Sequence, residues 1–129
     1  MAVVVVLLGA SGCGRSEDEA TVRTVAGGFL DAVESGDGDQ ACADLSPTTR
    51  GELESQEQRP CREAVTELEL EGGSVARVQV YLLNAMVEFS SGEAAFLDQG
   101  KEGWRLSAVG CKPHGDKPAD QPFDCELES

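Results

Sequence analysis

The sequence of 129 residues has few of the side chains from which most catalytic sites are built. It contains a single histidine, His114, and a single tyrosine, Tyr81. A hydrolytic triad needs a histidine as its general base, and His114 stands between Pro113 and Gly115 in a segment without regular pattern. The sequence also lacks a Gly-x-Ser-x-Gly elbow and a glycine-rich phosphate loop. It therefore predicts no catalytic residue and no cofactor.

Basic residues are scarce as well. Ten Lys and Arg stand against 24 Asp and Glu, which gives a formal net charge of -14, and every one of these charges lies after Cys13. Such a chain is repelled by the phosphates of nucleic acids and by anionic membrane surfaces, so we expect no nucleic-acid partner. The acidity indicates a well-solvated surface, or else a cationic partner. Aromatic residues make up only 5% of the chain, so the predicted core is mostly aliphatic.

No apolar run is long enough to cross a membrane. Residues 2–10 are apolar without interruption, whereas a transmembrane helix needs about 20 such residues and a run of roughly ten is typical of a signal-peptide core. The basic residues that usually precede such a core are absent from residues 1–3. The alternative is that residues 1–13 form a buried strand or helix with an ordinary Cys13.

The residues that follow, Ala10-Ser11-Gly12-Cys13, resemble a bacterial lipobox. The resemblance implies that residues 1–12 are a lipoprotein signal peptide and that the thiol of Cys13 carries a diacylglycerol. Two acyl chains are enough for stable anchoring, which one chain is not. We therefore expect an exported protein that is anchored through Cys13 on the outer face of the bacterial cytoplasmic membrane.

The chain has five cysteines, at positions 13, 42, 61, 111 and 125. Setting Cys13 aside leaves an even number, as expected of disulfides in an oxidising compartment. Four cysteines allow three pairings. We predict the pairs Cys42–Cys61 and Cys111–Cys125, because the two members of each pair fall in one structural neighbourhood.

A zinc site is the competing interpretation of the C-terminal cysteines. Cys111 and His114 are three residues apart, and Cys125 lies beyond them. Zinc would need these thiols reduced and more nitrogen ligands than a single histidine supplies. We therefore predict no metal.

Apolar residues recur at helical spacing in the first half of the chain. After a polar tether over residues 13–19, the pattern predicts helices up to about residue 71. Ser46-Pro47 has the form of an N-cap followed by proline at the first helical position. The predicted helices cover residues 20–35, 39–45, 48–58 and 60–71, with Asp39 capping the second.

The period changes to two from residue 75 onward. Short turns between the alternating segments force antiparallel pairing. The sheet should span residues 75–111, with a loop over residues 99–103 and a tail over residues 112–129. In its first strand, Val78, Val80 and Leu82 alternate with Gln79, Tyr81 and Leu83. The tail should add an edge strand over residues 123–127. The prediction is one α+β domain over residues 20–129, in which N-terminal helices pack on a curved antiparallel sheet.

Three stretches carry a resemblance to a known family. They are "GWRLSAVGC" (residues 103–111), "PFDC" (residues 122–125) and "FLDAVESGD" (residues 29–37). The first two are similar to the end of small actinobacterial lipoproteins of uncharacterised function, which resemble the cone-shaped, cystatin-like superfamily of nuclear transport factor 2, ketosteroid isomerase and polyketide cyclases. The third is similar to the first helix of that superfamily and its exit. The resemblance implies a pocket at the open end of a cone, and fold alone does not fix its function.

Four aromatic residues are the expected lining of that pocket: Phe29, Tyr81, Phe89 and Trp104. For Trp104 the alternative is a core anchor, and for Tyr81 a surface aromatic of the sheet. An isomerase-like site would need a carboxylate base and an acidic donor, and Asp31 or Asp98 with Tyr81 are the available groups.

The first functional interpretation is a non-enzymatic, lipid-anchored envelope protein that binds a small apolar ligand or a protein partner. The alternatives are a cyclase- or isomerase-like enzyme that uses the cone pocket, and a structural accessory subunit with a filled core. The interior of the sheet discriminates among them, because a cavity with converging polar groups favours a ligand or chemistry.

Overall fold

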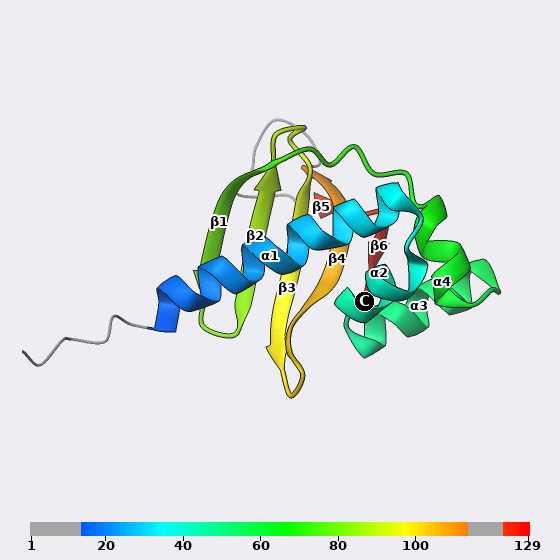
Figure 1. Ribbon diagram of the computed structural model, residues 1–129, viewed down its shortest axis with the longest axis horizontal. Coiled ribbons are helices and arrows are strands. Elements are labelled where there is room, and N and C mark those ends of the chain that lie inside the picture. Colours follow the sequence, from blue (N-terminus) through cyan, green and yellow to red (C-terminus); the bar gives the residue numbers. More distant parts are fainter. Residues whose placement is uncertain (1–13, 114–122) are drawn as a thin grey trace, which may run out of the picture.

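The computed structural model of this protein describes residues 14–113 and 123–129 (Figure 1). In these residues the chain forms helices first and an antiparallel sheet afterwards. The helices pack on one face of a curved sheet, so the fold is α+β, as the sequence predicted. The predictions for residues 1–12, Cys13 and His114 fall outside the described residues.

The first helix, α1 (Gly14–Ser35), runs diagonally across the sheet (Figure 1). The predicted tether over residues 13–19 is corrected by the structure, because residues 14–19 form the first turns of this helix. Two side chains in these turns reach the sheet. Arg15 Nη2 donates to the Val80 carbonyl at 3.4 Å, and Trp104 Nε1 donates to Asp18 Oδ1 at 3.0 Å. These contacts with residues distant in the sequence stabilise a helix over residues 14–19, where the local sequence pattern alone indicates a solvated linker.

Three short helices and one 3₁₀ turn follow: α2 (Gly38–Asp44), α3 (Pro47–Glu57), α4 (Cys61–Ala64) and η1 (Val65–Glu67). Ser46 caps α3 as predicted, since its Oγ accepts the Thr49 N–H at 3.2 Å. The cap of α2 is Asp37 and not Asp39. The helix expected over residues 60–71 is shorter, because the chain leaves helical geometry after Glu67.

The sheet has the order β1-β2-β3-β4-β5, and β6 also pairs with β4. All of these pairings are antiparallel. The strands are β1 (Val75–Tyr81), β2 (Asn84–Phe89), β3 (Ala94–Gly100), β4 (Gly103–Pro113), β5 (Phe123–Asp124) and β6 (Leu127–Glu128).

Three details of the predicted sheet were wrong. Leu82 is not part of a strand, because it lies in the turn between β1 and β2, where it is exposed. The expected loop over residues 99–103 shrinks to a turn, because β3 continues to Gly100 and β4 begins at Gly103. The edge strand expected over residues 123–127 is two short strands, β5 and β6, which flank Cys125.

The core lies between α1, the short helices and the inner face of the sheet. Its largest fully buried side chains are Phe29, Leu45, Leu53, Leu97, Leu106 and Leu127. They are mostly aliphatic, as the low aromatic content predicted. A smaller apolar cluster on the outer face includes Phe96 and Phe123, whose ring centroids lie 5.2 Å apart.

Candidate functional site

Three of the four residues expected to line an interior pocket lie in the core of the domain. Phe29, Phe89 and Trp104 are 1%, 6% and 3% exposed and belong to the main core. Tyr81, in contrast, stands 76% exposed at the end of β1. The four predicted pocket residues therefore divide into three core residues and one surface residue, which are the alternatives stated above for Trp104 and Tyr81.

The groups considered for an isomerase-like site do not converge on the interior. Asp31 is exposed on α1, and Asp98 is exposed on β3. Asp98 lies opposite Asn84 in the sheet, whereas Asp31 belongs to a different layer. A carboxylate base must lie within hydrogen-bond reach of its substrate together with the acidic donor. Nothing in this arrangement assembles such a pair inside the fold.

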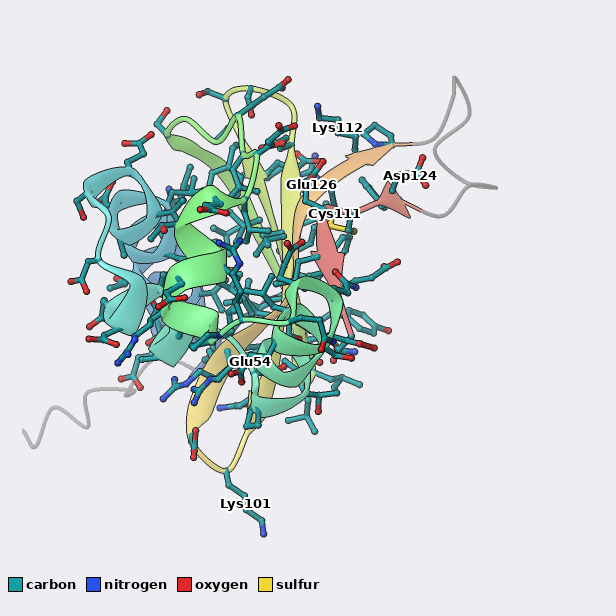
Figure 2. All side chains as sticks on the ribbon, turned by 90° about the vertical axis from the view of Figure 1, so that its right-hand side faces the viewer. Glu54, Lys101, Cys111, Lys112, Asp124 and Glu126 are labelled. Atoms are coloured by element: carbon teal, nitrogen blue, oxygen red, sulfur yellow. A yellow bond between two sulfur atoms is a disulfide. The ribbon has the colours of Figure 1, made fainter. Side chains whose placement is uncertain are left out.

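Two surface hollows lie at the end of the sheet where β1 joins β2 and β3 joins β4. One hollow of about 320 Å³ lies between the start of α3 and the β3–β4 hairpin. Asp98, Lys101, Glu102 and Arg105 contribute to its lining. Figure 2 shows Lys101 projecting from this hairpin, away from the rest of the chain. These four ionisable side chains therefore line a surface hollow and not the predicted interior pocket.

A second hollow, of about 480 Å³, lies between the start of α1 and the β1–β2 turn. Its lining includes Gly14, Arg15, Asp18, Tyr81 and Leu82. The first described residue after Cys13 thus lies beside the exposed apolar residues of this turn. The sequence does not reveal this proximity, because residues 14–19 have the composition of a polar tether.

Two disulfides join the four cysteines after residue 13, and the predicted pairing is confirmed. Cys42 on α2 is bonded to Cys61 on α4, and Cys111 on β4 is bonded to Cys125. Figure 2 shows the disulfide at Cys111, which lies on β4 beside Lys112. The bonds close loops with sequence separations of 19 and 14 residues, and each should stabilise the fold by about 3 kcal/mol.

The second disulfide removes the zinc alternative, since Cys111 and Cys125 have no thiolate left to offer a metal. Within residues 14–113 and 123–129, no group of three or more His, Cys, Asp or Glu side chains could hold a metal ion.

Glu93 is a buried carboxylate that analysis of the sequence did not single out. It is 3% exposed, and its Oε1 accepts the N–H groups of Glu71 and Gly72 at 2.8 and 2.9 Å. Its Oε2 is buried without a hydrogen-bond partner in the described part of the chain. Both bonds hold the connector between η1 and β1, so the role of Glu93 is structural.

Ion pairs on the surface account for the clear pKa shifts of exposed groups. The hydrogen bond from Arg59 holds the pKa of the Glu67 carboxyl below its usual range. The Lys112 ammonium lies 3.2 Å from Glu71 Oε1, and this contact raises the pKa of Lys112. Such exposed pairs contribute little to stability and do not mark a site.

None of the helices in the described residues has the length and apolarity that a membrane span requires.

No family model, no curated protein and no solved structure was found to match this chain. The resemblance to small actinobacterial lipoproteins with a cone-shaped domain therefore stays a prediction.

Proposed function

We propose that this chain is an exported lipoprotein of the bacterial envelope. In this proposal Cys13 carries the lipid, and the domain acts outside the cytoplasmic membrane by binding a protein partner. The observation that carries the proposal is the division of the five cysteines. Four are joined in pairs, and the fifth directly follows an apolar run and small residues.

The pairing supports export because disulfides persist in oxidising compartments and are rare in the cytosol, where thiols are kept reduced. A disulfide between α2 and α4 and another at the end of β4 tie together separate parts of a small domain. Small exported domains often depend on such bonds, since their cores bury limited apolar area.

The burial of three of the predicted pocket residues supports binding over catalysis. The inward-facing aromatic residues Phe29, Phe89 and Trp104 occupy the space that a cone pocket would need. The interaction surface is then the exterior, which carries most of the net charge of -14. Charge complementarity steers association, so the preferred partner is a protein with a basic surface.

Fractionation of cells that produce the full-length protein tests the anchoring. The wild-type protein should pellet with membranes and be released by detergent but not by high salt, because acyl chains and not charges hold it. Cys13→Ser should appear in the soluble exported fraction or remain unprocessed. Ser11→Ala keeps a small residue before the cysteine and should behave as wild type. Equal membrane association of wild type and of Cys13→Ser protein from which residues 1–12 have been removed would overturn the proposal.

A small ligand is the second candidate, favoured by the hollow of about 320 Å³ between α3 and the β3–β4 hairpin. Its volume lies at the lower end of the range for ligand pockets. Native mass spectrometry of protein extracted from its own membrane tests this candidate. An additional small mass that Arg105→Ala abolishes would support it, and its absence would leave the protein partner as the sole proposal.

A further inference from the structure

Three large apolar side chains stand exposed at one place on the molecule. Tyr81, Leu82 and Leu83 are 76%, 81% and 61% exposed, and together they join β1 to β2. We call these three residues the apolar tip. Within the described residues, they are the exposed large hydrophobic side chains of the domain. Contiguous exposed apolar residues of this kind mark interaction sites with proteins or membranes.

The backbone of the apolar tip is strained at Leu82. This residue has a φ of +56°, in the left-handed region. The preferred residues in two-residue hairpin turns are Asn and Gly, which adopt positive φ with little penalty. Leucine at this position is unfavourable for two reasons. Its side chain disfavours a positive φ, and its apolar surface is exposed to water. The fold does not require an exposed leucine here, and a contact outside the domain would compensate for both penalties.

The apolar tip is held firmly by its neighbours. The Gln99 N–H on β3 donates to the Leu83 carbonyl at 2.8 Å. When the side-chain amide of Asn84 is oriented with its nitrogen toward acceptors, this nitrogen donates to Asp98 Oδ1 at 2.9 Å. On the other side, Arg15 of α1 donates to the Val80 carbonyl. The three side chains are therefore presented on an ordered turn, which lowers the entropy cost of binding.

The apolar tip also lies beside the start of α1. Gly14 and Arg15 line one hollow together with Tyr81 and Leu82, and Figure 1 shows the start of α1 near the turn between β1 and β2. Consecutive Cα atoms are about 3.8 Å apart. A lipid on Cys13 would therefore leave the bilayer close to the apolar tip, and the linker between the two would be very short.

We propose that the apolar tip inserts into the outer surface of the bilayer that holds the lipid of Cys13. Tyrosine is enriched at membrane–water interfaces, and the two leucines suit the acyl boundary below it. The net charge of -14 cannot draw the domain to an anionic surface. Contact then depends on the anchor and on apolar insertion, and it fixes which face the domain turns away from the membrane. This inference rests on the proposed lipid anchor.

A fluorescent probe in the apolar tip tests the proposal. The full-length protein with Tyr81→Trp is extracted from membranes and reconstituted into vesicles of zwitterionic lipid, with or without bromine on the acyl chains. The native Trp104 is 3% exposed and supplies a constant background. Emission from position 81 should shift to the blue in vesicles and lose most of its intensity with brominated lipid. Glu34→Trp, near the far end of α1 and exposed, should keep its emission in both.

A second variant separates contact from folding. Leu82→Asn with Leu83→Asn, added to the Tyr81→Trp protein, should abolish quenching by brominated lipid. The same pair should leave the melting temperature unchanged or raised, because asparagine relieves the strain at position 82. A lowered melting temperature together with persistent quenching would contradict the role assigned to the two leucines.

The mass of the same sample keeps this inference distinct from the proposed function. An acylated mass without quenching overturns the membrane contact and leaves the anchor in place. A blue shift without quenching by brominated lipid also overturns it, since the apolar tip would then face protein. A mass without acyl chains overturns the proposed function and this inference together.

Discussion

Glu93 is the residue on which the connector between the helices and the sheet depends. One carboxylate oxygen accepts the backbone N–H groups of Glu71 and Gly72, and Gly72 is itself buried. Leaving a buried hydrogen-bond donor without its acceptor lowers the free energy of unfolding by about 1–3 kcal/mol. Glu93→Ala should therefore lower the free energy of unfolding by about that amount.

Urea denaturation followed by circular dichroism measures this loss. Glu93→Gln keeps an oxygen acceptor and should lose less than Glu93→Ala, while Glu34→Ala on the exposed face of α1 should change stability little. Equal stability of Glu93→Ala and Glu34→Ala would show that the two hydrogen bonds contribute nothing.

Asp44 makes stability depend on pH. Burial raises the pKa of its carboxyl above the usual value, against the opposing effects of Gln40 and Arg105. The folded state then binds the proton more tightly than the unfolded state does. The resulting stabilisation is present below the ordinary aspartate pKa and is lost as the pH rises through the folded pKa.

Asp44→Asn removes this loss, so its stability relative to wild type should be greater at pH 7 than at pH 3. Chemical denaturation at both pH values gives the two differences, and Asp31→Asn controls for removal of one surface charge. A stability difference for Asp44→Asn that is the same at both pH values would contradict the assigned pKa shift.

The local pattern of the sequence revealed some of these residues and concealed others. Ser46 and Pro47 were predictable as a cap because their chemistry acts within one helical turn. Glu93 was not, because its partners lie 21 and 22 positions away. Leu82 was misplaced because alternation treats any apolar residue as part of a strand, and no Asn or Gly marks the turn.

Among the elements, α2 and α4 approach each other most closely at a glycine. A Cβ atom on Gly38 would lie 1.9 Å from the carbonyl oxygen of Arg62, on the backbone of α4. Gly38→Ala must push the two helices apart where Cys42 and Cys61 are bonded. We expect a loss of about 1–3 kcal/mol.

Gly51 in α3 is the matched control, because a Cβ there meets nothing within 4 Å. Gly51→Ala should raise stability by about 0.5–1 kcal/mol through better helix propensity. Thermal denaturation should thus move in opposite directions for the same chemical change. A gain for Gly38→Ala would contradict the close approach of the two helices.

The elements were predictable wherever periodicity was long and strong. The apolar stripe of α1 follows from apolar residues spaced three or four positions apart, and the antiparallel strands β1 to β4 follow from apolar residues at every second position. The first turns of α1 carry no such stripe. The contacts of Arg15 and Asp18 with the sheet link residues more than 60 positions apart, which no local pattern reveals. The acidic residue Glu17 in the first turn, favoured at helix N-termini, was the available signal.

At the scale of the whole molecule, the sequence predicted the class of fold and the covalent frame better than the site. The even cysteine count and the position of each pair led to the observed disulfides. Of the four residues expected to line a pocket, three pack into the core and one is exposed. Periodicity shows which side chains face inward, but it does not show whether they leave a cavity.

The surface points to one orientation of the domain. The apolar tip and the start of α1 lie together, while Cys111 and Lys112 lie far from the β3–β4 hairpin in Figure 2. If the first group faces the bilayer, the short helices and strands β5 and β6 remain available to a partner. The acidic charge of the chain then projects into the space outside the membrane.

The central claim is that one sulfur carries lipid outside the cell while the other four are joined in pairs. The intact mass of protein extracted from its native membrane, alkylated with and without prior reduction, tests it most directly. The account predicts a chain that begins at Cys13 with a diacylglycerol, takes up no alkylating groups as extracted, and takes up four after reduction. An unprocessed chain without lipid, with five thiols open to alkylation, would contradict it.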